Sequence, residues 1–267
     1  MNIPHTGIQS ALDLRSGYFQ MAVNPSDIVK TTFVTKSGTY AISKMPFGLS
    51  GADPNFQKAI DIIFKPVIGK FVSVYMDDVI ISSPSFTQHV KNLKEVFRLL
   101  HEVGLTLNKD NCKFGCEELK YFGLIINKQE IKTDEAKVQA IVEMKPPRTS
   151  KEVLKFLGMS QWYAKFIKNY ADICEPLYNL KRKLKRFIWL IEAQKAFDAD
   201  KAVMTKAPVL KFPDFKKPFE LFTDASSIGV GTVLNQEQRP VVFASCTLSA
   251  AERNYTVTER EREREND

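Results

Sequence analysis

Two short apolar runs flank an acidic tetrapeptide, and this arrangement constrains the fold more than any other stretch of the chain. The runs cover residues 70–74 and 79–82, and Tyr75-Met76-Asp77-Asp78 lies between them. Each run predicts a β-strand, so the acidic pair is expected at the tip of a hairpin. Two adjacent carboxylates are costly to bury without a partner, so they are either solvated or bound to a metal ion. An isolated Asp-Asp pair in a turn is more often solvated, and only the rest of the chain separates the two interpretations.

The composition is that of a globular protein without a membrane span. The chain has 267 residues, of which 44% are hydrophobic, enough for one large or two modest cores. No apolar run approaches the length of a membrane span, and no signal peptide is apparent at the start. We therefore expect an intracellular protein. The four cysteines suggest neither a disulfide framework nor a zinc site, and the three histidines form no cluster.

Positive charge is in excess and locally concentrated. The formal net charge is +7 and the isoelectric point is near 9.1. Five of the six residues 181–186 are basic, and the preceding stretch 162–170 alternates aromatic side chains with lysines. A solvated basic helix face explains each patch equally well. Basic residues among aromatics also suit the backbone of a nucleic acid, so a polyanionic partner is favoured.

The pattern along the chain predicts an α+β fold in three parts, residues 1–127, 128–215 and 216–267. In the first part, residues 11–21 and 31–42 are expected as strand or loop. Helices are predicted at 55–64 and at 89–103, where Gly104 ends the second helix. Residues 105–107 and 121–126 have the composition of strands.

The second part is predicted to be helical and the third to open with strands. One helix should begin after a Thr133 cap and end at Met144, before Pro146-Pro147. Thr149-Ser150-Lys151-Glu152 is a capping box, and a further helix is expected at 192–204. Prolines 208, 213 and 218 indicate an extended linker. The remaining predictions are strands at 219–224, 229–234 and 241–244, a helix from about Thr258 and a low-complexity run at 259–265.

A second strand-end carboxylate gives the acidic pair a partner. Asp13 lies where an apolar strand runs into a turn, some sixty residues before the hairpin. One aspartate from one strand and a pair from a neighbouring hairpin can hold two divalent cations, and hard oxygen ligands favour Mg²⁺ or Mn²⁺. Successive strand residues point to opposite faces, so Asp77 and Asp78 should not contribute equally. Asp77 with Asp13 is the predicted principal metal bridge.

Further motifs follow one another in the order found in one known family. They are residues 12–20 around Asp13, Met45-Pro46-Phe47-Gly48-Leu49, 75–78, 105–114, Tyr121-Phe122-Gly123, 156–158, 162–163, 166–167, 208–210 and Thr223-Asp224-Ala225-Ser226. In this ordered set the chain resembles the reverse transcriptase region of a gypsy-type LTR retrotransposon polyprotein. The resemblance implies a right-hand polymerase palm with partial fingers, a helical thumb and tether, and a truncated ribonuclease H-like α/β domain.

The same resemblance assigns roles around the carboxylates. Asp13, Asp77 and Asp78 match the metal-binding catalytic triad, for two Mg²⁺ or Mn²⁺ ions, and the Leu14 carbonyl is the expected extra ligand. Tyr18 matches the aromatic gate that excludes a ribose 2′-hydroxyl, because a ring packed against the sugar leaves no room for the extra oxygen. Without the motif, Tyr18 would be interpreted as an ordinary core aromatic.

Other substrate contacts follow from the resemblance. Phe47 and Gly48 match the nucleotide pocket, where glycine permits close backbone approach; the alternative is a plain turn after Pro46. Lys109 is either a phosphate contact or proton donor, or a surface charge. Tyr121, Phe122 and Gly123 match the primer grip.

The chain also departs from the family pattern. From the resemblance we expect this sequence to lack the fingers strands that lie upstream of Asp13 in the family, with the basic residues that grip the triphosphate. Residues 52–55 shift the usual proline by one place, which affects the start of that helix, and Leu190 weakens the following helix cap. Asp224 matches the first ribonuclease H carboxylate and Glu261 the helical glutamate. Residues 262–264 replace apolar positions and two further aspartates fall beyond the last residue, so no ribonuclease H activity is expected.

Two function classes follow. The first is an RNA-directed DNA polymerase, or a fragment of one, that acts on deoxynucleoside triphosphates with an RNA or DNA template–primer. The second is an inactive nucleic-acid-binding remnant of a mobile element. The expected location is the cytoplasm or a virus-like particle, with no membrane partner, and the oligomeric state is left open.

Overall fold

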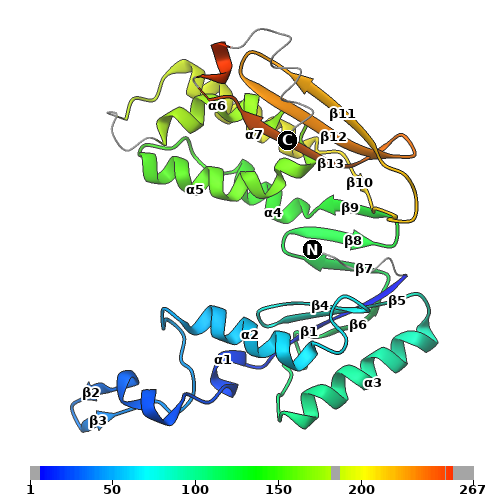
Figure 1. The fold of residues 1–267 in the computed structure, drawn as a ribbon. Coiled ribbons are helices and arrows are strands. Elements are labelled where there is room, and N and C mark those ends of the chain that lie inside the picture. Colours follow the sequence, from blue (N-terminus) through cyan, green and yellow to red (C-terminus); the bar gives the residue numbers. More distant parts are fainter. Residues whose placement is uncertain (1–6, 182–186, 250, 255–267) are drawn as a thin grey trace. The chain divides into compact units, whose positions relative to one another are not determined.

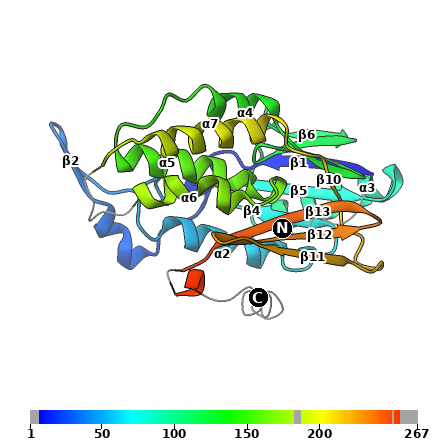
Figure 2. The same ribbon diagram turned by 90° about the horizontal axis from the view of Figure 1, so that it is seen from above.

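A computed structural model describes residues 7–181, 187–249 and 251–254 of the chain (Figures 1 and 2). The chain divides into two compact units, residues 1–119 and 120–267, and each is described by itself. The helix predicted from about Thr258 and most of the basic run 181–186 lie outside the described residues. Among the described residues, no helix is long and apolar enough to cross a membrane.

The first unit is built on a four-stranded antiparallel sheet with the order β4-β5-β1-β6 (Figure 1). Its strands are β1 (Ile8–Asp13), β4 (Val72–Tyr75), β5 (Asp78–Ser83) and β6 (Lys113–Cys116). The β4–β5 hairpin predicted from the sequence is confirmed. The register pairs Asp13 of β1 with Asp78 of β5, so the acidic ends of the two strands meet at the same end of the sheet.

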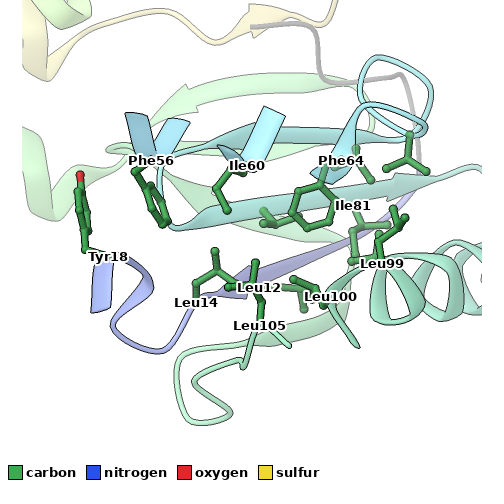
Figure 3. Close-up of a cluster of buried hydrophobic side chains, with 14 of the residues drawn as sticks. Leu12, Leu14, Tyr18, Phe56, Ile60, Phe64, Ile81, Leu99, Leu100 and Leu105 are labelled. Atoms are coloured by element: carbon green, nitrogen blue, oxygen red, sulfur yellow. The ribbon is translucent and has the colours of Figure 1, made fainter. Parts of the chain in front are cut away.

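Two helices share one apolar core with this sheet (Figure 3). They are α2 (Ala52–Phe64) and α3 (Phe86–Glu102). Phe56, Ile60 and Phe64 are fully buried at intervals of four residues, which is the spacing of one helix face. On α3 the buried residues Val96, Leu99 and Leu100 have the same helical spacing, three and four residues after Val96. Each buried side chain of this size contributes about 1.5–3 kcal/mol relative to exposure, so the core fixes the end of the sheet that carries the aspartates.

Helix α2 begins three residues earlier than the sequence pattern predicted, at Ala52 instead of Asn55. Pro54 lies in the first turn, where backbone N–H groups have no partner within the helix, so the proline costs no hydrogen bond there. The shifted proline therefore leaves the helix start intact.

Helix α3 also begins earlier than predicted, at Phe86 instead of His89. The Ser85 side chain caps it by accepting a hydrogen bond from the Gln88 amide at 3.3 Å. Its end is as predicted: Gly104 has a φ of 71°, the left-handed conformation that closes a helix.

The rest of the first unit is short elements. They are α1 (Gly17–Gln20), the 3₁₀ helix η1 (Pro25–Thr31), and the hairpin strands β2 (Phe33–Thr35) and β3 (Gly38–Tyr40). The strand predicted at residues 105–107 was wrong. A single isolated β-bridge forms there, between Leu107 and Leu14, because the loop turns back toward β1.

The second unit opens with a small sheet of order β10-β9-β8-β7. Its strands are β7 (Glu118–Tyr121), which begins at the end of the first unit, β8 (Leu124–Asn127), β9 (Glu130–Thr133) and β10 (Leu210–Lys211). The single strand predicted at residues 121–126 is instead two strands. Phe122 and Gly123 have φ values of 48° and 74°, and these left-handed residues turn the chain between β7 and β8.

Helices make up the middle of the second unit. They are α4 (Glu135–Val142), α5 (Ser150–Ser160), the 3₁₀ helix η2 (Gln161–Phe166), α6 (Tyr170–Leu180) and α7 (Ile191–Thr205). The sequence pattern missed α6. Pro176 lies inside it, and an internal proline normally argues against a helix. Packing against α7 and the last sheet outweighs that cost (Figures 1 and 2).

The caps of these helices differ from the predictions in detail. Asp134 caps α4, not Thr133: its carboxylate accepts a hydrogen bond from the Ala136 amide at 3.2 Å. Thr149 caps α5 as predicted, but the carboxylate of Glu152 accepts from the Arg148 amide. At α7 the N-cap residue Leu190 supplies no side-chain cap, as expected.

A three-stranded antiparallel sheet completes the described fold. Its strands, in spatial order, are β11 (Glu220–Ala225), β12 (Gly229–Gln236) and β13 (Arg239–Thr247), followed by the 3₁₀ helix η3 (Glu252–Asn254). All three were predicted, although β12 and β13 are longer. The Glu237-Gln238 turn has φ values of 54° and 61°, which suits a two-residue hairpin. The division of the chain into three parts stays a prediction.

Candidate active site

The acidic hairpin turns through a strained residue. Tyr75 pairs with Asp78, so Met76 and Asp77 form a two-residue turn, and Met76 has a φ of 52°. A side chain in this left-handed region costs about 1–2 kcal/mol. The Met76 amide donates to Oε1 of Gln57 on α2 at 2.7 Å, which stabilises the turn. The tip of the hairpin is thereby held against the helix that forms the core.

The strand register and a backbone hydrogen bond place the three predicted aspartates at the same end of the sheet. Asp13 lies directly opposite Asp78, and the Leu14 amide donates to the Asp77 carbonyl oxygen at 3.2 Å. Leu14 itself is buried. Asp77 and Asp78 differ, as the sequence predicted: Asp78 is a strand residue, whereas the Asp77 side chain turns in over Gly17 of α1.

The electrostatics of the carboxylates favour a cation. Burial, then the charges of Asp13 and Asp78, raise the pKa of Asp77 above its ordinary value. Burial, then Asp13, raises the pKa of Asp78. Oδ1 of Asp77 is buried without a hydrogen-bond partner among the described residues. Carboxylate oxygens of this kind are the ligands that Mg²⁺ prefers, so the donor set fits the ion. Within the described ranges, however, no three His, Cys, Asp or Glu side chains converge closely enough to hold a metal ion.

A loop after α3 holds Asp13 from the other side. The Asn108 amide donates to the Asp13 carbonyl oxygen at 2.8 Å, and Nδ2 of Asn111 donates to Oδ2 of Asp13 at 2.9 Å. Sequence reasoning missed Asn111 and chose Lys109 from the same loop. Lys109 is exposed, and its predicted role stays a prediction. An amide side chain in the loop motif was the available signal.

Tyr18 lies near Phe56 in the buried cluster (Figure 3), and it is close enough to Asp77 to interact with its charge. Its ring stacks on Phe56 at a centroid distance of 4.6 Å and an interplanar angle of 16°. Phe47 contacts it at 5.0 Å with a 50° tilt. The Tyr18 hydroxyl donates to Oδ1 of Asp53 at 2.9 Å. Burial, then this hydrogen bond, raises the pKa of Tyr18 to about 12.

Phe47 and Gly48 are placed where a small ligand could reach them. The Phe47 side chain is 62% exposed and also lies edge-on to Phe19 at 5.4 Å. Gly48 has a φ of 88°, so any other residue would be strained there. In contrast, Tyr18 is only 7% exposed, because Phe47 and Phe56 cover its ring.

The predicted primer grip forms a turn in the second unit. Nε1 of Trp162 donates to the Phe122 carbonyl at 2.9 Å, and the Tyr163 hydroxyl donates to the Gly123 carbonyl at 3.3 Å. A Cβ atom at Gly123 would lie 2.5 Å from the Tyr163 hydroxyl, and the φ of 74° would strain any other residue, so both observations favour glycine. A mostly apolar pocket of about 580 Å³ adjoins the turn. Its lining residues are Phe122, Gly123, Lys137, Ala140, Ile141, Gly158, Met159, Trp162 and Tyr163.

Of the two predicted ribonuclease H-like carboxylates, the structure describes Asp224 but not Glu261. Asp224 lies on β11 opposite Gly231 of β12, in the strand predicted for it. Glu261 lies outside the described residues. The structure therefore places only the first of the pair.

Comparison with known protein families shows which family the chain belongs to. Residues 3–160 match the family described as reverse transcriptase (RNA-dependent DNA polymerase). The chain belongs to the reverse transcriptase family. Residues 189–262 of this reverse transcriptase also match an RNase H-like domain found in reverse transcriptase.

Curated relatives agree with the predicted resemblance to gypsy-type elements. The retrovirus-related Pol polyprotein from transposon 297 of Drosophila melanogaster is 40% identical over 253 residues, covering 94% of this chain and 24% of the relative. The Pol polyprotein from transposon gypsy of the same organism is 38% identical over 264 residues, covering 94% and 26%. The chain thus spans about a quarter of the length of these curated relatives.

Solved structures confirm the predicted α+β reverse transcriptase fold. The foamy viral protease-reverse transcriptase, solved in complex with an RNA/DNA hybrid, matches with a TM-score of 0.84 and 22% identity. The match covers 97% of this chain and 36% of that chain. A second foamy viral structure, in complex with double-stranded DNA, matches with a TM-score of 0.85.

Proposed function

We propose that this reverse transcriptase chain performs RNA- and DNA-templated DNA synthesis, in which a primer 3′-hydroxyl attacks the α-phosphate of a deoxynucleoside triphosphate and pyrophosphate leaves. The observation that carries the proposal is the pairing of Asp13 with Asp78 across two strands, with Asp77 in the turn between β4 and β5. Family membership supplies the reaction class, and these three carboxylates supply the chemistry it needs.

Asp13, Asp77 and Asp78 would hold two Mg²⁺ or Mn²⁺ ions. When bound, such ions activate the attacking hydroxyl and neutralise charge on the leaving group. The raised pKa values of Asp77 and Asp78 support this assignment, because a nearby cation would relieve the repulsion that raises them. The buried, unpartnered Oδ1 of Asp77 is the atom with most to gain from a ligand.

The nucleotide would bind beside the carboxylates, against the aromatic cluster. Phe47 is exposed and Gly48 allows close backbone approach, so they suit the base and sugar. Tyr18 would limit the space at the sugar C2′ position and so select deoxynucleotides. Phe47 contacts the Tyr18 ring, so the two rings would line the same side of the nucleotide pocket.

The proposed macromolecular partner is a template–primer duplex. The foamy viral relatives were solved with an RNA/DNA hybrid and with double-stranded DNA. The +7 net charge of this chain favours a phosphate backbone. The turn at Phe122-Gly123 would contact the primer strand together with Trp162, which donates to the Phe122 carbonyl. Nζ of Lys165 lies 4.7 Å from the centroid of the Trp162 ring and would add positive charge there.

Primer extension tests the proposal. Purified protein is given poly(rA)/oligo(dT), dTTP and Mg²⁺, and the wild type is compared with Asp77→Asn and Asp13→Asn. Each substitution removes a charge from the site, so extension should fall by about 100-fold or more. Asp198→Asn, the same change at an exposed position on α7, is the matched control and should retain activity. Template binding without extension by the wild type would favour the inactive nucleic-acid-binding remnant instead.

A further inference from the structure

Asp53 is a carboxylate that no role so far accounts for. It is exposed in the first turn of α2, beside the shifted proline, and it accepts the hydrogen bond from the Tyr18 hydroxyl at 2.9 Å. Asp53 and Phe56 are three residues apart, so they lie on the same face of α2. Both the stacking partner and the hydrogen-bond partner of Tyr18 therefore come from one face of one helix.

The two contacts restrain different movements of the Tyr18 ring. Stacking on Phe56 opposes motion away from the ring plane, but stacked rings slide past one another at little cost. A hydrogen bond is directional and acts at the hydroxyl, the atom farthest from the backbone. It therefore opposes the in-plane sliding that stacking permits. A position near the N-terminus of α2 also favours the ionised carboxylate, which makes it a stronger acceptor.

We propose that Asp53 is a positioning residue for sugar selection: it holds the Tyr18 ring at the place where the ring excludes a ribose 2′-hydroxyl. This inference rests on the proposed function, since Tyr18 must face the nucleotide sugar. The hydrogen bond also occupies the only proton of the Tyr18 hydroxyl, which then has none to donate to a ribose oxygen. Both effects act against ribonucleotides.

The test is a double-mutant cycle read as the ratio of kcat/KM for dTTP over that for UTP. Asp53→Ala should lower this ratio by about three- to tenfold, the range for a partly exposed hydrogen bond to a carboxylate. Asp53→Asn keeps an acceptor oxygen and should remain close to the wild type. Tyr18→Phe removes the hydroxyl and should lower the ratio to a similar extent. In that background Asp53→Ala should cause no further fall.

A purely structural role for Asp53 would give a different pattern. Charge at the start of α2 stabilises the helix, so Asp53→Ala should lower Tm in both backgrounds without regard to the Tyr18 hydroxyl. An unchanged discrimination ratio in Asp53→Ala, or an equal fall in the Tyr18→Phe background, overturns the inference. Tyrosine labelled with ¹³C at Cζ adds a readout independent of activity. The Tyr18 resonance, identified by its loss in Tyr18→Phe, should shift in Asp53→Ala and hardly move in Asp53→Asn.

A second assay separates this inference from the proposed function. Complexes on a primer ending in a 3′-dideoxynucleotide bind the next nucleotide without chemistry, and their stabilisation by dTTP or UTP gives a binding ratio. Loss of binding discrimination in Asp53→Ala, with no extension by the wild type, would overturn the proposed activity and support the inference. Extension by the wild type with identical ratios in all variants would overturn the inference alone. Absence of any nucleotide-dependent complex would overturn both.

Discussion

Gly17 lies directly beneath the Asp77 carboxylate, and a Cβ atom at Gly17 would fall far inside the contact distance of Asp77 Oδ1. The same atom would lie 2.8 Å from the Phe56 ring. Glycine at this position is therefore a steric requirement, imposed from one side by the Asp77 carboxylate and from the other by the Phe56 ring of the core. The missing side chain at Gly17 leaves the space in which Oδ1 of Asp77 is buried at the tip of the hairpin.

Gly17→Ala should disturb both neighbours of that glycine. The added methyl group must displace the Asp77 carboxylate or the Phe56 ring, so we expect a loss of about 1–3 kcal/mol in the free energy of unfolding and a severe loss of primer extension. Urea unfolding and extension assays measure the two effects. Gly158→Ala is the stability control, because a Cβ atom at Gly158 meets nothing within 4 Å. Equal stability of Gly17→Ala and the wild type would contradict the steric account.

Asp77→Asn should stabilise the protein while it removes activity. The folded-state pKa of Asp77 is raised, so ionisation of this carboxyl destabilises the fold as pH rises through that pKa. Relief of repulsion between neighbouring carboxylates should add about 0.2–1 kcal/mol at neutral pH, and the gain should vanish below the ordinary pKa of 3.8. Thermal unfolding with EDTA, at several pH values, measures this. A variant less stable than the wild type at pH 7 would count against it.

Mg²⁺ should raise the stability of the folded protein, whereas repulsion between the same carboxylates lowers it. A cation that binds only the folded state raises its stability by an amount set by concentration over Kd, about 1.4 kcal/mol at tenfold excess. The rise in Tm on adding Mg²⁺ should therefore be larger for the wild type than for Asp77→Asn, with Asp198→Asn like the wild type. Equal shifts in all three proteins would place the ion elsewhere.

Trp162→Phe should loosen the turn at Phe122-Gly123. The substitution keeps an aromatic ring but removes the Nε1–H that donates to the Phe122 carbonyl at 2.9 Å. We expect about 0.5–1.5 kcal/mol less stability and a weaker affinity for template–primer, with little change in the KM for dTTP. Chemical denaturation and a binding titration of a labelled duplex measure these quantities. Tyr163→Phe, which loses only the longer bond to Gly123 at 3.3 Å, should show a smaller effect.

Asp200 should make the stability of the second unit depend on pH. It is fully buried beside Tyr170, whose hydroxyl lies 3.4 Å from Oδ2, and burial raises the pKa of Asp200 to about 6. Because the folded-state pKa lies above the ordinary 3.8, stability present below about pH 4 is lost as pH rises through about 6. The loss should be about 2–4 kcal/mol by pH 8.

Tryptophan fluorescence is a suitable probe for this dependence, because Trp162 and Trp189 are the two tryptophans of the chain and both belong to the second unit. Urea unfolding at about pH 4, 6 and 8 should show a much flatter profile in Asp200→Asn. Asp198→Asn, an exposed change two residues away, should keep the wild-type profile. If the free energy of unfolding changes with pH equally in Asp200→Asn and in the wild type, groups other than Asp200 cause the pH dependence.

Much of the fold could be predicted because it depends on local pattern. Strong apolar spacing defined α2 and α3, and runs of β-branched residues defined β4 and β5. Prediction failed where tertiary packing opposed local preference. Helix α6 forms despite Pro176, and the strand expected at 121–126 breaks at Phe122, a residue with no local preference for a left-handed conformation.

The sequence by itself determined which residue types stand at the candidate site: a carboxylate at a strand end, a pair of carboxylates at a hairpin tip, a tyrosine shortly after the first carboxylate, and a glycine-rich turn downstream. Their identities are chemical and can be recognised from order and spacing. Only the tertiary structure decided the pairing of Asp13 with Asp78, the position of Asp77 over Gly17, and the bond from Tyr18 to Asp53. These contacts join residues 35 to 65 positions apart on different elements, and hydrogen bonds and steric exclusion act over a few ångströms of space, whatever the separation along the chain.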